Sequence, residues 1–232
     1  MPAPLEEMRI VAARLKPLDV PFAFIGGAVV CLLVDHPALT EFRRTKDVDV
    51  IVEVVTYTEY AALEERLRQA DFQHDLSEGA PICRWLVDGC RVDIMPKAPA
   101  NLGMNTKWFP EVLQQARNTD LGEGCLARVV TPPLFLATKL EAFKDRGKGD
   151  YYASHDLEDI ITLVDGRAAI VAEVAVVTAD IRRFVSSEFL RISKHPDFRD
   201  ALPGHLPAML GARQRVSIVA NRFEAVAALS VY

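Results

Sequence analysis

Asp47 and Asp49 are separated by one residue at the start of an apolar run that extends to Val55. Side chains alternate between the two faces of a strand, so both carboxylates are expected on one face, about 7 Å apart. Carboxylates at that spacing repel each other, and a shared hard cation such as Mg²⁺, which takes oxygen ligands, relieves the repulsion. The alternative interpretation is an exposed strand face that carries two solvated aspartates.

A third aspartate, Asp93, lies in the middle of the apolar run from Cys90 to Met95, between two aliphatic residues. An ionised carboxylate in such surroundings needs a partner. A metal ion shared with Asp47 and Asp49 would be that partner. The sequence therefore predicts a divalent-cation site built from these three aspartates.

Gly26 and Gly27 follow the apolar run 22–25, at the point where a predicted strand leads into a helix. Glycine lets the backbone approach a ligand closely, and a helix N-terminus offers free N–H groups to phosphate oxygens. An ordinary turn is the alternative interpretation. Basic residues crowd the approach to the aspartates, as a site for a polyanion requires: Arg43, Arg44 and Lys46.

Together these residues resemble the signature of the polymerase β-type nucleotidyltransferase superfamily over residues 22–96. That signature is a Gly-Gly or Gly-Ser turn, a hydrophobic–Asp–hydrophobic–Asp strand and a third acidic residue on a neighbouring strand. The Arg-x-Thr-x-Asp-x-Asp form, with Arg43 and Thr45, looks most like the AbiEii/MenT-like nucleotidyltransferases, many of which are toxins of toxin–antitoxin systems. The chain departs from many members by having Ala28 where they carry Ser or Thr.

The helical part of the chain extends the resemblance. The family carries a lysine on a helix after the third acidic strand and, later, Arg or His followed by Asp-x-x-Asp; Lys139 and the stretch His155 to Asp159 resemble these. Lys139 lies among apolar residues, so it either contacts a triphosphate or is a surface lysine whose stem packs on them. Asp156 belongs to the site by resemblance, whereas alone it would indicate a helix start with favourable acidic charge.

The resemblance implies a magnesium-dependent transferase that moves a nucleoside monophosphate from a nucleoside triphosphate such as ATP to a hydroxyl acceptor. Two Mg²⁺ ions, with Mn²⁺ as an alternative, would be held by Asp47, Asp49 and Asp93. The catalytic residues would be these three with Lys139 and Asp156. The nucleotide would be bound by Gly26, Gly27, Arg43, Arg44, Thr45 and Lys139.

The acceptor suggested by the resemblance is the 3′ end of tRNA, and a cognate antitoxin protein is an expected partner. Basic residues are spread over the C-terminal region and could bind an RNA backbone: Arg182, Arg183, Arg191, Lys194, Arg199, Arg213, Arg215 and Arg222. Ordinary solvated helix faces are the other interpretation. Two further hypotheses are transfer to a small hydroxylated molecule, as in antibiotic-modifying members, and a non-catalytic partner within a toxin–antitoxin system.

These residues need strands to carry the aspartates and a helix behind the glycines. Short apolar runs and turn residues predict strands over 22–25, 48–55, 72–75, 82–87, 91–95 and 126–130, with a hairpin turn at Asp88-Gly89. Helical periodicity predicts helices over 5–18, 28–33, 59–70, 134–144, 155–164, 171–192 and 213–229. Thr56 is the expected N-cap of the helix over 59–70, and 35–46 is expected to be a loop.

The chain is therefore expected to be α+β over residues 1–130, where the resemblance implies a mixed β-sheet of the nucleotidyltransferase type with flanking helices, followed by a C-terminal helical bundle over 131–232. Its 232 residues carry a net charge of −5, which gives no general attraction to nucleic acid or to an anionic membrane. No apolar run reaches the ~18 residues of a membrane helix, and no signal peptide is recognisable, so a cytoplasmic location is expected. The four cysteines show no CxxC spacing and are expected to be reduced thiols.

Overall fold

The computed structural model describes residues 3–36, 42–43, 45, 47–98, 107–147, 149–207 and 212–229. Arg44, one of the predicted nucleotide-binding residues, lies outside them, as does Lys46. The chain divides into two compact units. Unit 1 comprises Met1–Val29 and Arg44–Thr131, and unit 2 comprises Val30–Arg43 and Pro132–Tyr232. The sequence prediction had placed the whole of 30–43 in the first domain.

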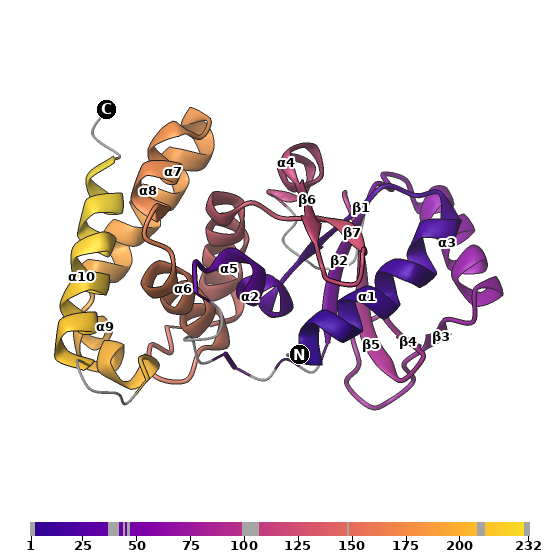
Figure 1. Cartoon of the computed structure of the whole chain (residues 1–232), viewed down its shortest axis with the longest axis horizontal. Coiled ribbons are helices and arrows are strands. Elements are labelled where there is room, and N and C mark those ends of the chain that lie inside the picture. The colour runs from indigo at the N-terminus through magenta and orange to yellow at the C-terminus, as the bar shows by residue number, and fades with distance from the viewer. Residues whose placement is uncertain are drawn as a thin grey trace. The chain divides into compact units, whose positions relative to one another are not determined.

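The described strands of unit 1 form one seven-stranded sheet in the order β3-β4-β5-β2-β1-β7-β6 (Figure 1). Their bounds are β1 Phe22–Ile25, β2 Val48–Val52, β3 Gln73–His74, β4 Arg84–Val87, β5 Cys90–Pro96, β6 Arg117–Asp120 and β7 Leu126–Val129. The pairs β2–β5 and β1–β7 are parallel, and the other neighbours are antiparallel. The predicted mixed sheet is confirmed.

Helices flank this sheet, and α1, α3 and α4 bury apolar residues. They are α1 (Ala3–Leu15), the 3₁₀ turns η1 (Lys16–Leu18) and η2 (Gly27–Val29), α3 (Tyr57–Gln69) and α4 (Phe109–Gln115). Met8, Val11 and Leu15 of α1 are all buried, and α1 packs against β2 and β5. The hydroxyl of Tyr60 on α3 donates a hydrogen bond of 3.2 Å to the carbonyl of Ile94 on β5.

The predicted hairpin between β4 and β5 is confirmed and sets the register of both strands. Asp88 and Gly89 both have positive φ angles, 47° and 79°, as a two-residue type I′ turn requires. Antiparallel pairing then proceeds from Val87 opposite Cys90 to Arg84 opposite Asp93. The turn therefore places a basic side chain beside the third predicted metal ligand.

Unit 2 is helical, as predicted for the C-terminal part. Its elements are α2 (Val30–Leu33), α5 (Pro132–Arg146), α6 (His155–Gly166), α7 (Ile170–Val176), α8 (Ala179–Lys194), α9 (Pro196–Ala201), η4 (Leu202–His205) and α10 (Ala212–Ala228). Helix α5 packs on α6 and α8, and α10 packs on α8 and α6. In the core between α8 and α10, the rings of Phe189 and Phe223 stack with centroids 4.5 Å apart.

The structure differs from the sequence prediction in several elements, among them α9 and η4, which were not predicted. The helix expected over 171–192 is two helices, because Val177 and Thr178 adopt extended backbone angles between α7 and α8. The break falls in the run Val176-Val177-Thr178, whose β-branched side chains disfavour a helix. Helix α4 and strand β6 were not predicted; β6 is a polar edge strand without the apolar alternation that signals a strand.

Cys31, Cys83 and Cys90 are buried and, like Cys125, are free thiols, in agreement with the sequence prediction. Burial raises the pKa of Cys83 to about 12 and that of Cys31 to about 11, so both thiols are protonated at neutral pH. Within the described residues, no helix has the length and apolar character that a membrane span requires.

The capping box at the start of α3 gives the first testable prediction. The Thr56 hydroxyl accepts a hydrogen bond from the Glu59 N–H, and the Glu59 carboxylate accepts one from the Thr56 N–H. Thr56→Ala removes a cap and is expected to lower the free energy of unfolding by about 1 kcal/mol in urea denaturation. Thr58→Ala, the same change at an exposed position within α3, is the control and should shift it by less than about 0.5 kcal/mol. Equal effects at the two positions would contradict the capping role.

Candidate active site

The parallel pairing of β2 with β5 brings two predicted metal ligands together in unit 1. Asp49 and Asp93 are register partners on these adjacent strands. Asp47 lies just before β2, and its side chain is 28% exposed, whereas that of Asp93 is 11% exposed. The acidic residues that are distant in sequence therefore meet at one end of the paired strands.

Arg84 on β4 joins Asp47 to Asp93. Its Nε and Nη2 donate hydrogen bonds of 2.7 and 2.8 Å to the two carboxylate oxygens of Asp93. The same Nη2 lies 2.5 Å from Oδ2 of Asp47. The bonds to Asp93, together with the charges of all three aspartates, raise the pKa of Arg84 further above its ordinary value, so it is always protonated. The partner that the sequence assigned to Asp93 was a metal; in the structure that partner is an arginine.

Gly26 lies directly against Asp49. Its φ of +76° is in the left-handed region, and a Cβ built on it would come within 1.8 Å of Oδ2 of Asp49. Glycine at this position therefore leaves the room that the Asp49 carboxylate occupies. Gly27 begins η2 immediately afterwards, and Thr45 is half-buried on the approach to Asp47.

A fourth carboxylate, that of Glu7 on α1, adds to the negative charge near Asp47. Partial burial raises the pKa of Glu7, and the charge of Asp47 raises it further. The buried thiol of Cys83 is also influenced by the charges of Asp93 and Asp49. This end of the sheet is therefore strongly acidic, with Arg84 as a compensating charge.

The chemical type of the ligands suits a hard divalent cation, because three carboxylates supply the oxygen ligands that Mg²⁺ prefers. The absence of a side chain at Gly26 leaves room for the Asp49 carboxylate at this end of the sheet. In the described residues, however, no three acidic, histidine or cysteine side chains converge as a ready metal site. The guanidinium of Arg84 bonds to Asp47 and Asp93 from between them.

The predicted residues of unit 2 form a separate cluster of charges around Lys139. The ammonium of Lys139 lies 3.1 Å from Oδ1 of Asp156 and 2.7 Å from Oδ2 of Asp159, and all three side chains are at most 8% exposed. Arg146 donates two hydrogen bonds to Asp156, at 2.8 and 2.9 Å. Burial by itself would raise the pKa of Asp156, but the bonds and charges of Arg146 and Lys139 outweigh it and lower that pKa. Lys139 is thus held by two buried carboxylates.

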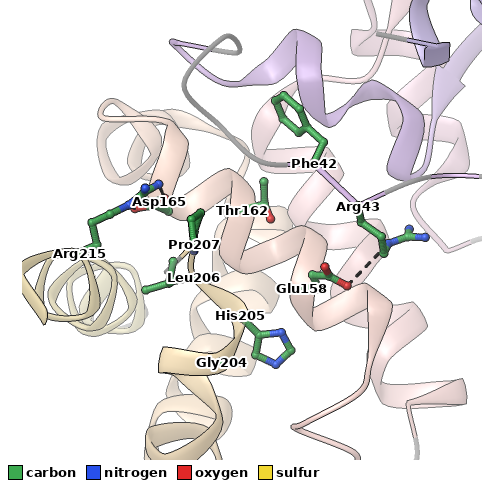
Figure 2. Close-up of a pocket in the computed structure, with 10 residues that line it drawn as sticks. All are labelled: Phe42, Arg43, Glu158, Thr162, Asp165, Gly204, His205, Leu206, Pro207 and Arg215. Carbon is green, nitrogen blue, oxygen red and sulfur yellow. Dashed lines mark hydrogen bonds and ion pairs between the residues drawn. The ribbon is translucent and has the colours of Figure 1, made fainter. Parts of the chain in front are cut away.

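Arg43 also belongs to the charges of unit 2. Its guanidinium lies 3.2 Å from Asp159 and 3.9 Å from Glu158. It borders a pocket of about 270 Å³, in which Figure 2 shows Arg43 beside Glu158 on one side and Arg215 beside Asp165 on the other. Each of these arginines faces an acidic residue of α6, so the charges that line the pocket are compensated and give it no marked preference for an anion.

Sequence reasoning missed Arg84 and Glu7. A signal for Arg84 was present: a two-residue turn at Asp88-Gly89 fixes antiparallel register, and counting back four pairs from it places Arg84 opposite Asp93. Glu7 had no comparable signal, because its position near Asp47 depends on how α1 packs on the sheet.

No protein-family model matches the sequence, and no curated protein matches it significantly. Solved structures do. A crystal structure of an antigenic nucleotidyltransferase-like protein from Paracoccidioides brasiliensis is 22% identical, with a TM-score of 0.52 over 86% of this chain and 91% of that one. JHP933 from Helicobacter pylori is 14% identical, with a TM-score of 0.53 over 100% of this chain and 94% of that one. The chain therefore has the α+β fold of a nucleotidyltransferase-like protein, a mixed sheet followed by helices.

Gly26→Ala is expected to destabilise the protein more than a positive φ alone explains. The new Cβ would overlap the Asp49 carboxylate, so Asp49 or β1 must shift. Gly79→Ala is the matched control, since Gly79 has a φ of +80° and open space around its Cα; it should cost about 1 kcal/mol of unfolding free energy. Gly26→Ala should cost at least about 2 kcal/mol more in urea denaturation. Equal losses would show that Asp49 does not occupy this space.

Asp156→Asn is expected to lower the free energy of unfolding at neutral pH by about 3 kcal/mol, because Lys139 and Arg146 lose a buried charged partner. The pKa of Asp156 is lowered in the folded state. Its contribution is therefore complete above the unfolded-state pKa and disappears as the pH falls through the folded-state pKa. The gap between wild type and variant should narrow towards about pH 3.

Urea unfolding followed by circular dichroism at a series of pH values measures this gap. Asp145→Asn, at an exposed position of α5, is the control and should behave as wild type throughout. A gap that stays constant from neutral to acidic pH would contradict the ionised, paired state of Asp156.

Proposed function

We propose that this chain is a divalent-metal-dependent nucleotidyltransferase, which transfers a nucleoside monophosphate from a nucleoside triphosphate to a hydroxyl acceptor. The observation that carries the proposal is the register pairing of Asp49 with Asp93 on adjacent strands. Arg84 joins Asp47 to Asp93 by hydrogen bonds, and Gly26 packs against the Asp49 carboxylate. The likeness in fold to a nucleotidyltransferase-like protein is consistent with it. Three carboxylates at one end of a sheet have a clear use as oxygen ligands for a hard cation.

In this proposal Asp47, Asp49 and Asp93 hold Mg²⁺. The metal, when bound, supplies charge that activates the attacking hydroxyl and neutralises the leaving pyrophosphate. Gly26 and Gly27 themselves add no side chain at the start of η2, so the backbone there can approach a phosphate beside the Asp49 carboxylate. Since Ala28 has no hydroxyl, the backbone N–H groups of this turn are the anchor that the chain offers to phosphate oxygens.

The acceptor that the family resemblance suggests is a tRNA 3′ end. Five of the basic side chains named for RNA binding are engaged inside unit 2. Arg183, Arg191 and Arg215 pair with carboxylates, while Arg182 and Arg222 donate to backbone carbonyls. Engaged arginines attract a phosphate backbone less than free ones do. The second candidate acceptor is a small hydroxylated molecule, and an assay must offer both kinds.

The decisive assay incubates the purified protein with each of the four α-labelled nucleoside triphosphates, with Mg²⁺ or Mn²⁺ and with total tRNA or a panel of aminoglycosides. Label transferred to an acceptor is the expected result. Asp49→Asn should reduce the rate at least about a hundredfold, because it removes the charge of a direct ligand. The variant should keep the thermal stability of the wild type, since it relieves repulsion with Asp93.

Asp200→Asn, an exposed position on α9, is the control and should retain full activity. Transfer at the wild-type rate by Asp49→Asn would contradict the role given to the carboxylates. No label on any acceptor, together with no thermal stabilisation by nucleotide and metal, would leave the third hypothesis: a non-catalytic partner, for instance in a toxin–antitoxin system.

A further inference from the structure

Arg84 fills the place between two carboxylates that the proposed function gives to a divalent ion. Its Nη2 lies 2.5 Å from Oδ2 of Asp47 and 2.8 Å from Oδ2 of Asp93, so one nitrogen spans both side chains. An ion of the size of Mg²⁺ binds oxygens at about 2.0 to 2.1 Å. The nitrogen and such an ion therefore cannot occupy this gap together.

Resting on the proposed metal site, we infer that Arg84 is a resident counter-cation that competes with divalent metal for Asp47 and Asp93. In the metal-free protein its guanidinium holds the two carboxylates in position. When metal binds, the guanidinium moves out of the gap between Asp47 and Asp93. Arg84 is thus a positioning residue for the ligands and also sets how readily the site takes up metal.

The surroundings of Arg84 allow this exchange. Its side chain is 19% exposed and that of Asp47 is 28% exposed, so the guanidinium can turn towards water. The cation of unit 2 is different, because Lys139 is 8% exposed and its carboxylate partners are each 6% exposed. A divalent ion carries twice the charge of a guanidinium and approaches the oxygens more closely, so Coulomb's law favours it once it has lost water.

A purely structural role for Arg84 makes the opposite prediction for metal affinity. If the arginine only supports Asp47 and Asp93, removing it disorders the ligands and weakens metal binding. If it competes with metal, removing it frees the ligands and strengthens metal binding. The sign of the change therefore separates the two roles without any measurement of activity.

The test is a titration of the full chain with Mn²⁺ alone, followed by the electron paramagnetic resonance signal of the free ion. Arg84→Met keeps the length of the side chain and removes its charge. Its apparent Mn²⁺ affinity should exceed that of the wild type by about tenfold or more. In the wild type only the minor population in which Arg84 has left the two carboxylates can bind metal, whereas in the variant every molecule can. Its metal-free melting temperature should fall, since the carboxylates then face one another uncompensated.

Two further variants control for charge and for folding. Arg91→Met removes an equal charge at an exposed position two residues before Asp93 and should raise the Mn²⁺ affinity by less than about threefold, through screened long-range attraction. Arg84→Lys keeps one charge but lacks the fork that spans both carboxylates, so its affinity should lie between those of wild type and Arg84→Met. It also serves if Arg84→Met does not fold.

An affinity for Mn²⁺ in Arg84→Met that equals or falls below that of the wild type would overturn the inference, as would an equal gain in Arg91→Met. If wild type binds Mn²⁺ and the variant binds no more tightly, the inference fails and the proposed function stands. If Arg84→Met binds Mn²⁺ and the wild type does not, the exchange stands and metal-dependent transfer by the wild type fails. If neither protein binds, both fail.

Discussion

Repulsion among carboxylates is the constraint on which the organisation of unit 1 depends. Parallel pairing of β2 with β5 forces Asp49 and Asp93 side by side, and Asp47 adds a third charge at the same end of the sheet. Such a group is stable only with positive charge in the gap. The hairpin supplies that charge in a side chain whose planar fork matches a carboxylate. Arg84 therefore belongs to the site as much as the aspartates do.

Unit 2 meets the same constraint with a different cation. There, Asp156 and Asp159 share a helix face one turn apart, and Lys139 from α5 lies between them. Arg146 and Arg43 each supply a further positive charge to one of the two carboxylates. Because Lys139, Asp156 and Asp159 are buried, replacing any one of these three leaves a buried charge without compensation, which costs far more than loss of a surface ion pair.

The sequence was sufficient to predict most of the strands, the helical second part, the hairpin and the N-cap at Thr56, because each depends on local patterns, whereas the mixed sheet was implied by the family resemblance. That β2 and β5 are neighbours followed from the family resemblance rather than from periodicity, and their parallel direction was not predicted. The contact of Arg84 with Asp93 was not predicted, because the hypothesis of a metal site already gave Asp93 a partner. Glu7 and β6 could not have been found, since a polar edge strand and the packing of α1 leave no periodic signal. The predicted roles of the site residues stay predictions.

The tight turn at Asp88-Gly89 has a consequence for the order in which the sheet assembles. A two-residue loop closes at a small entropic cost, and hairpins form within microseconds. The contact of Arg84 with Asp93 is local, whereas the alignment of Asp49 with Asp93 spans a long intervening chain. If the hairpin closes first, Arg84 neutralises Asp93 before the distant strand docks, and the acidic strands then associate without an electrostatic barrier.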